Sequence, residues 1–223
     1  MTGIERTELM EWVMTRHLKL ILTVLALAGL SGCATMSGDE CLTSDWEAIG
    51  YEDGARGYTS DQLGARRKAC AKHGVTPDFA AYQHGRAQGL DEYCQPGRGF
   101  NVGSSGYRYN GVCSAHNEAA FLDAYGAGYQ LYSLRANVNR ATNAINAREN
   151  ELDRIRDDMS AKEVALISSE TTAEERVVLL LDLKEMSERT GQIEAEIKGL
   201  YDERARHQVE LENYQVVLVD YGY

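Results

Sequence analysis

The chain has 223 residues, of which 43% are hydrophobic and 26% are charged, a balance typical of folded soluble proteins. Its formal net charge is −11. Because such a chain repels nucleic acid and anionic lipid headgroups, we expect no nucleic-acid partner and no polybasic membrane-binding patch.

The first predicted element is a secretory signal peptide over residues 1–32. Its core is a nearly unbroken apolar run from Leu20 to Leu30. This run is shorter than the roughly 20 residues of a membrane-spanning helix and fits a signal-peptide h-region. Basic residues precede it. Three glutamates lie before Met14, and secretory n-regions avoid acidic residues, so we expect translation to start at Met14.

Leu30-Ser31-Gly32-Cys33 ends the apolar run and resembles the lipobox of bacterial lipoproteins. That resemblance implies removal of the signal peptide and attachment of fatty acids such as palmitate to Cys33. Two or more acyl chains then hold a protein stably at a membrane. Because Ala34 rather than aspartate follows the cysteine, the resemblance favours the outer membrane, with the protein facing the periplasm. The alternative is an unmodified cysteine at the edge of an ordinary helix.

A polar tether over residues 33–40 precedes three predicted helices. Each begins after a residue that suits a helix N-cap. The expected caps and ends are Ser44 to about Tyr58, Ser60 to about Gly74, and Thr76 to about Glu92. The first cap belongs to a capping box with Glu47, and Pro77 suits the first turn of the third helix.

The next segment is rich in glycine. Five glycines between Gly97 and Gly111 alternate with aromatic residues, so we do not expect a regular helix there. A short, irregular β-hairpin over about residues 107–113 is the prediction.

Four cysteines remain after the lipobox, and an even number in an oxidising compartment predicts two disulfides. They are Cys41, Cys70, Cys94 and Cys113. Antiparallel folding of the first two helices favours Cys41 with Cys70, and closure of the glycine-rich segment favours Cys94 with Cys113. A zinc site normally has close C-x-x-C pairs, which are missing here, so we expect no metal and no other cofactor.

A tyrosine stands one helical turn before a glycine three times, at Tyr51, Tyr82 and Tyr125. Glycine costs about 1 kcal/mol relative to alanine inside a helix, so these glycines need a reason. We interpret them as faces where another helix or an aromatic ring approaches the backbone closely. The alternative is a head surface of these tyrosines and His84 that binds a glycan or a peptide.

The second half of the chain shows the heptad repeat of a coiled coil. One apolar seam runs from Leu131 to Leu166, and a second runs from Leu179 to Leu218. A capping box at Thr172-Ala173-Glu174-Glu175 marks the start of the second helix. We predict an antiparallel hairpin over residues 133–223, after a head over residues 41–132. Polar seam residues, which we interpret as fixing the register, are Arg148, Thr190, Arg204 and His207.

The predicted fold is therefore mainly α. A small disulfide-stapled helical head, with a Gly/Tyr-rich loop or short β-hairpin, is followed by a long antiparallel coiled-coil helical hairpin.

Several spacings in the head resemble a bacterial lipoprotein family known as domain of unknown function 2799. They are Asp45-Trp46, Gly50-Tyr51-x-Asp53-Gly54, Cys70, Gly74-x-x-Pro77-Asp78, Ala81-Tyr82-x-x-Gly85-Arg86-x-x-Gly89-Leu90, Tyr93-Cys94, Gly111-Val112-Cys113 and Phe121-x-x-Ala124-Tyr125-x-x-Gly128-x-x-Leu131-Tyr132. The resemblance covers about residues 41–132. It implies location and architecture, and it supplies no reaction and no catalytic residue.

The sequence carries no G-x-S-x-G, H-E-x-x-H or P-loop signature, so we name no catalytic residue. We expect a lipid-anchored envelope protein that serves as a structural or protein-interaction module in the periplasm. Its arm would dock to an envelope protein, to the cell wall or to a second copy through the coiled coil. The alternative is a small envelope enzyme, or a glycan- or peptide-binding module, that uses the head.

Overall fold

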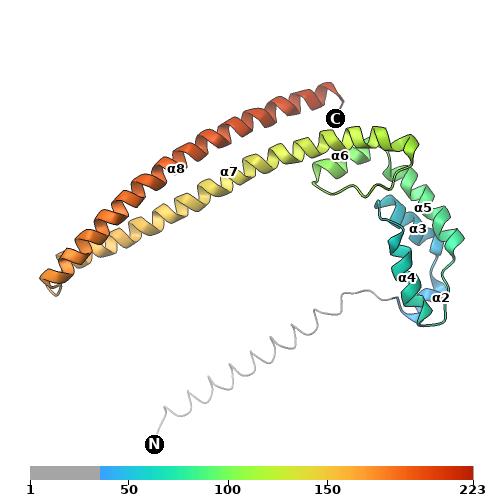
Figure 1. The fold of residues 1–223 in the computed structure, drawn as a ribbon, viewed down its shortest axis with the longest axis horizontal. Coiled ribbons are helices and arrows are strands. Elements are labelled where there is room, and N and C mark those ends of the chain that lie inside the picture. The colour runs from blue at the N-terminus through green and yellow to red at the C-terminus, as the bar shows by residue number, and fades with distance from the viewer. Residues whose placement is uncertain (1–35, 223) are drawn as a thin grey trace, which may run out of the picture.

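The computed structural model describes residues 36–222, which form helices without any strand among them. The helices are α2 (Gly38–Thr43), α3 (Trp46–Ala55), α4 (Asp61–Ala71), α5 (Phe79–Tyr93), α6 (Pro96–Ser104), α7 (Ala115–Ile167) and α8 (Ala173–Asp220). Figure 1 shows a head of short helices from which α7 leads into a long arm, and α8 returns along α7. This arrangement confirms the predicted mainly helical head and helical hairpin. No helix of the described part is long and apolar enough to cross a membrane.

Helices α3 and α5 cross at glycines, where the two backbones touch. A Cβ atom added to Gly50 would lie 2.0 Å from the carbonyl oxygen of Tyr82. One added to Gly85 would lie 1.9 Å from the carbonyl oxygen of Glu47. The glycine four residues further along each helix makes the same kind of contact. The glycines therefore allow close helix packing, as their spacing predicts.

Helices α6 and α7 repeat this crossing. A Cβ atom at Gly99 would lie 2.4 Å from the carbonyl oxygen of Phe121, just as one at Gly50 meets that of Tyr82. Ala124, three residues after Phe121, stands where α5 has Gly85. The head thus contains two helix pairs, α3 with α5 and α6 with α7, which are built on one pattern.

The first helix of each pair also ends in the same turn. Gly57 and Gly106 follow α3 and α6 with positive φ angles of 69° and 74°, a conformation that favours glycine. The ring of Tyr93 covers Gly57, and the ring of Tyr132 covers Gly106. These matching ends show that the likeness of the two pairs extends beyond their crossing point.

One disulfide closes each helix pair. Cys41 bonds Cys70 with a Cα–Cα distance of 5.5 Å, and Cys94 bonds Cys113 with a Cα–Cα distance of 5.6 Å. In both pairs the first cysteine precedes the first helix and the second cysteine precedes the second helix. The bonded pairs are those that the sequence favours.

The structure corrects the starts of two predicted head helices and adds a short helix that was not predicted. The Asp45 carboxylate, and not the Ser44 hydroxyl, accepts from the first amides of α3 at 3.0 and 3.1 Å. Asp78 likewise replaces Thr76 as the cap of α5. A carboxylate caps these helices well because it both accepts the amide hydrogen bonds and complements the positive helix end. In addition, α2 begins at Gly38, inside the predicted tether.

The absence of a helix from the glycine-rich segment was a wrong expectation, because α6 occupies Pro96–Ser104. Its glycines give it a poor intrinsic helix propensity. However, Gly99 and Gly103 are the residues that let it touch α7, so tertiary contact stabilises it. Residues 107–113 form an irregular loop and not a hairpin.

The α8 helix is fixed at both of its ends, by the far turn of the arm and by packing next to the head. The far turn carries the predicted capping box of Thr172 and Glu175. At the other end, Leu211 and Leu218 pack against Leu131, close to the α6 crossing. Because α7 runs unbroken through 53 residues, it belongs to both the second helix pair and the arm.

Candidate functional site

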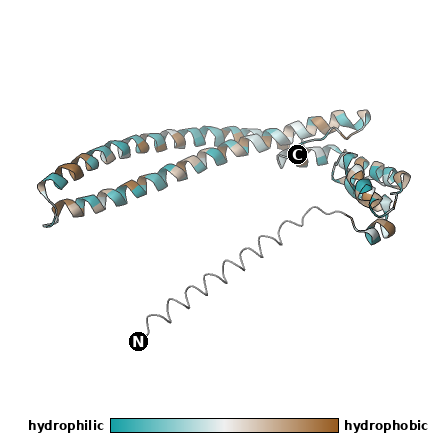
Figure 2. Ribbon diagram, turned by 60° about the horizontal axis from the view of Figure 1, so that its bottom comes forward, coloured by the Kyte–Doolittle hydropathy of each residue, from teal (hydrophilic) through white to brown (hydrophobic). Residues whose placement is uncertain are grey.

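The far end of the arm exposes a cluster of apolar side chains, which we call the tip patch. It consists of Val164, Ile167, Val177, Val178, Leu180 and Leu181, all more than half exposed. Ile167 reaches 81% exposure. Figure 2 shows apolar residues gathered near the turn between α7 and α8. Isolated exposed apolar residues are ordinary, but six around one turn are a feature of interaction surfaces.

The turn beneath the tip patch is held by polar contacts. The Thr172 backbone N–H donates to Glu175 at 2.8 Å and lowers the pKa of that carboxyl, which therefore stays ionised. The Arg176 guanidinium donates to the carbonyl oxygens of Leu166 and Ser168, the latter at 2.6 Å. These contacts fix the geometry of the turn that carries the patch.

The surroundings of the tip patch are acidic. Residues 160–185 contain six carboxylates and three basic side chains. All three bases are already engaged. Lys162 pairs with Asp182 at 2.5 Å, Lys184 pairs with Glu188 at 3.8 Å, and Arg176 binds backbone carbonyls. A cavity of about 730 Å³ beside the turn is lined by Glu170 and Glu174, among others. The tip therefore presents apolar side chains within a negative field.

Ion pairs brace the middle of the arm. Glu151 on α7 accepts from Arg148 and from Arg189 on α8, both at 2.6 Å, and Arg148 also pairs with Glu196 at 2.8 Å. Arg189 is the main cause of the lowered pKa of Glu151. Such cross-helix pairs fix the register of the two helices, the role that the sequence predicts for Arg148.

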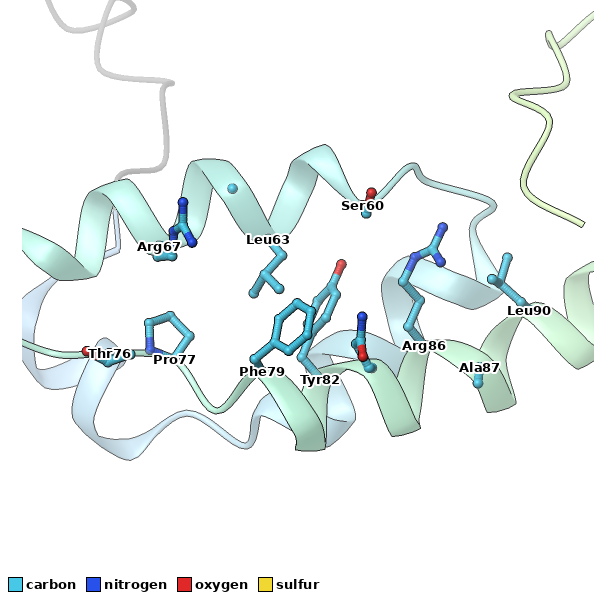
Figure 3. A pocket seen from close by; sticks show the side chains of 12 residues that line it. Ser60, Leu63, Arg67, Thr76, Pro77, Phe79, Tyr82, Arg86, Ala87 and Leu90 are labelled. Carbon is cyan, nitrogen blue, oxygen red and sulfur yellow. The ribbon is translucent and has the colours of Figure 1, made fainter.

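The head contains a second hollow, the α4–α5 cavity, with a volume of about 660 Å³. Figure 3 shows Leu63 of α4 facing Phe79 and Tyr82 of α5 across it. Arg67 lies at one end of the cavity, and Arg86 lies at the other.

Tyr82 connects this cavity to a buried polar group beneath it. Its hydroxyl donates to the carboxylate of Asp53 at 2.9 Å, and Asp53 is only 1% exposed. The Arg66 guanidinium donates to both oxygens of that carboxylate, with one distance of 2.9 Å. Burial, reinforced by the Asp53 hydrogen bond, raises the pKa of Tyr82 to about 12. The tyrosine is therefore neutral at physiological pH.

Comparison with known families assigns the head. Residues 45–130 match the model of a family described as protein of unknown function (DUF2799). This part of the chain is similar to the DUF2799 family. Comparisons with curated proteins and with solved structures find no match. The matched DUF2799 segment spans both helix pairs and ends within α7, so the tip patch lies beyond it.

The three predicted tyrosines take separate places in the DUF2799 segment. Tyr82 lines the α4–α5 cavity. The Tyr51 hydroxyl donates to Glu92 at 2.8 Å, which raises the pKa of Tyr51. Tyr125 lies in the second helix pair, where it donates to the carbonyl oxygen of Tyr107 at 3.1 Å. The three rings therefore do not line one groove.

The remaining predicted residues are also dispersed. His84 is exposed, and its Nδ1 lies 2.9 Å from a carboxylate oxygen of Glu47. The four head cysteines form the two disulfides, and no cluster of metal-ligating side chains occurs among residues 36–222. Cys33 lies outside the described residues.

Sequence reasoning missed the arginines of the DUF2799 segment and the role of Asp53. Both Asp53 and Arg86 stand in the spacings that carry the family resemblance. A usable signal was the position of Asp53 on the same face of α3 as Gly50, because a carboxylate on a face that packs needs a cation or a donor.

Proposed function

We propose that the protein is a lipoprotein of the bacterial outer membrane, anchored through acyl chains on Cys33, that holds a periplasmic protein partner at its tip patch. The apolar run and the lipobox-like Leu30-Ser31-Gly32-Cys33 support the anchor. Two disulfides in the head suit an oxidising compartment.

The length of the chain between anchor and head supports a head that lies at the membrane surface. Met36 packs against the core cluster around the first disulfide, only three residues after Cys33. Three residues extend at most about 11 Å. The α8 helix has 48 residues and a length of roughly 72 Å at about 1.5 Å per residue. The tip patch is thus the part of the molecule that the arm carries farthest from the head.

The observation that carries the proposal is the exposed apolar tip patch on an ordered turn. Its acidic surroundings disfavour an anionic bilayer and also a second, equally acidic tip. They favour a protein surface with an apolar centre and a basic rim, because such a surface complements both features.

The partner is tested by placing charges in the tip patch of the full chain in cells. The variant Val178→Asp with Leu181→Asp should lower the yield of cross-linked partner about tenfold or more, since it buries charge at the contact. The matched control is Val209→Asp with Val216→Asp, two similarly exposed positions of α8 away from the tip. Partner peptides at the cross-links should be rich in lysine and arginine.

Both double variants replace exposed side chains, so circular dichroism should show unchanged helix content for each. Equal loss of the partner in the two double variants, or no loss in either, rejects the tip patch as the binding surface. So does cross-linking of one tip only to another tip.

The anchor is tested separately by metabolic labelling. A labelled fatty acid should enter the wild-type protein, which should fractionate with the outer membrane. The Cys33→Ala variant should take up no label and leave the membrane fraction. Labelling of that variant at wild-type level contradicts attachment at Cys33.

A further inference from the structure

The α4–α5 cavity differs from the rest of the molecule in its charge. Of the twelve described residues that line it, six are apolar and none is acidic, although the chain has 34 acidic and 23 basic residues. The apolar six are Leu63, Pro77, Phe79, Tyr82, Ala87 and Leu90. Tyr82 adds no charge, because its hydroxyl stays protonated. The only charged groups on the cavity wall are therefore cationic.

Those cations are Arg67 and Arg86. Arg67 is exposed at the rim, and it makes no hydrogen bond or ion pair with any residue of the described part. Arg86 is held in place, since its Nη2 donates to the carbonyl oxygen of Tyr58 at 2.9 Å. Its Nε is buried without a hydrogen-bond partner among the described residues. A buried donor without a partner is unfavourable, so an acceptor at this position would stabilise the site.

The second helix pair closes the corresponding space with its own chain. There Tyr109, from the loop before α7, packs on Phe121 with ring centroids 4.8 Å apart. Tyr125 occupies the position of Arg86, since it lies four residues after Phe121 as Arg86 lies four residues after Tyr82. Its hydroxyl also makes the matching hydrogen bond, because it donates to the carbonyl oxygen of the residue after the positive-φ glycine. The second pair is thus filled and lacks the cation. Only the first pair combines open apolar space with a positive charge.

The mouth of the cavity exposes apolar surface as well. Phe79 lines the cavity and is 58% exposed, and Leu63 faces it from α4 (Figure 3). A volume of about 660 Å³ lies within the range of small-molecule sites, which are mostly apolar with a few fixed polar groups.

We infer that the α4–α5 cavity binds a single-chain amphiphile with an anionic head group. The apolar chain packs between Leu63, Phe79 and Leu90, and the carboxylate or phosphate head accepts hydrogen bonds from Arg86. Arg67 adds a second positive charge at the rim. This site is independent of the tip patch, which lies at the other end of the arm.

The site is tested with the full chain in membrane vesicles and a fatty acid that carries a photoreactive diazirine on its chain. Irradiation should label peptides from residues 61–90, as read by mass spectrometry. An unlabelled fatty acid and a lysophosphatidic acid are the competing anions, and the stronger competitor identifies the head group as carboxylate or phosphate. The fatty alcohol of equal length should compete about tenfold less well, because it lacks the charge that Arg86 binds. Equal competition by the alcohol, or labelling confined to other peptides, overturns the inference.

Two pairs of matched variants place the ligand. A Cβ at Gly64 meets no atom of the described chain within 4 Å, so Gly64→Leu fills the cavity without strain in α4. It should lower labelling about tenfold while the thermal midpoint holds or rises. Gly191→Leu is its control, because Gly191 is an equally open helical glycine on the arm. Unchanged labelling in Gly64→Leu overturns the site.

The rim charge is tested with Arg67→Glu, which should weaken competition by the anions roughly threefold, the effect of a partly screened charge. Lys68→Glu makes the same charge change on the neighbouring residue, which does not line the cavity, and should leave competition unchanged. An equal effect of the two variants overturns the contribution of Arg67. Tip-patch variants should leave labelling intact. The tests of the cavity and of the proposed partner can therefore be told apart.

Discussion

The two helix pairs of the head share a backbone arrangement and differ in what fills it. In both, glycines bring carbonyl groups of one helix against the other helix, and a left-handed glycine under a tyrosine ring ends the first helix. In the first pair, Asp53 meets Tyr82 and Arg66. In the second, the corresponding contact is Val102 with Phe121.

This difference shows that the glycine crossing defines the unit and that the side chains around it are free to specialise. The first pair has a buried carboxylate, an open cavity and an arginine on its wall. The second pair has an apolar core that a loop tyrosine covers. The first pair is thus equipped to bind a ligand, and the second joins the head to the arm through α7.

The largest expected effect comes from breaking the polar core of the first pair. Asp53→Ala leaves Arg66 and the Tyr82 hydroxyl without their acceptor and should destabilise the fold by about 4 kcal/mol. Urea unfolding followed by circular dichroism measures this loss.

The same core can be converted to the chemistry of the second pair. A triple variant with Asp53→Val, Arg66→Leu and Tyr82→Phe should unfold within about 1 kcal/mol of the wild type, because a buried ion pair exchanges well for apolar side chains. A triple variant as unstable as Asp53→Ala would show that the two pairs do not share an interchangeable core.

A smaller difference in stability is expected at the crossing position where the first pair has Gly85 and the second has Ala124. Gly85→Ala places a Cβ 1.9 Å from the carbonyl oxygen of Glu47 and should destabilise the fold by about 3 kcal/mol. The second pair accommodates Ala124 at this position, fully buried, so Ala124→Gly should cost only about 1 kcal/mol. The urea midpoints of the two variants, each compared with that of the wild type, measure this difference. Equal losses would mean that the crossings are equally tight.

The smallest effect is a pH dependence that only the first pair has. The folded-state pKa of Tyr82 is about 12, above its ordinary value of 10, so the folded chain holds this proton more tightly. The resulting stabilisation is complete below pH 10 and is lost as the pH rises through 12. The Tyr82→Phe variant has the ring of Phe121 at this position. Between about pH 9 and pH 12, its free energy of unfolding should therefore fall by about 2 kcal/mol less than that of the wild type.

Burial also raises the pKa of Tyr93, so part of the alkaline fall in stability remains in the Tyr82→Phe variant. Unfolding midpoints at several alkaline pH values give the slope of stability against pH for the wild type and for the variant. Identical slopes would show that the Tyr82 proton is not held more tightly in the folded chain.

The repeated unit was hidden in the sequence because its copies differ at key positions. Tyr82 and Gly85 correspond in space to Phe121 and Ala124, whereas the visible Tyr-x-x-Gly pattern aligns them with Tyr125 and Gly128. Alignment of the two helix pairs by identical residues therefore gives the wrong register. The contacts of each glycine with the partner helix give the correct one.

The candidate sites were predictable to different degrees. The heptads and the Thr172 capping box predicted the arm and its turn, because these signals are local or periodic. The tip patch follows from apolar residues that lie outside the heptad seam. The α4–α5 cavity was not predictable, since its walls come from two helices whose separation no local signal specifies.

The sequence by itself predicted the helical arm, favoured the disulfide pairing that the structure shows, and indicated the close-packing role of the glycines. Each of these depends on periodicity, on local geometry or on the chemistry of one residue type. Only the tertiary structure decided that the glycine-rich segment forms α6, that Asp53 is buried against Arg66, and that one helix pair stays open where the other is filled. The physical reason is that all three depend on which distant backbone or side chain lies opposite, and contact across the chain overrides local propensity.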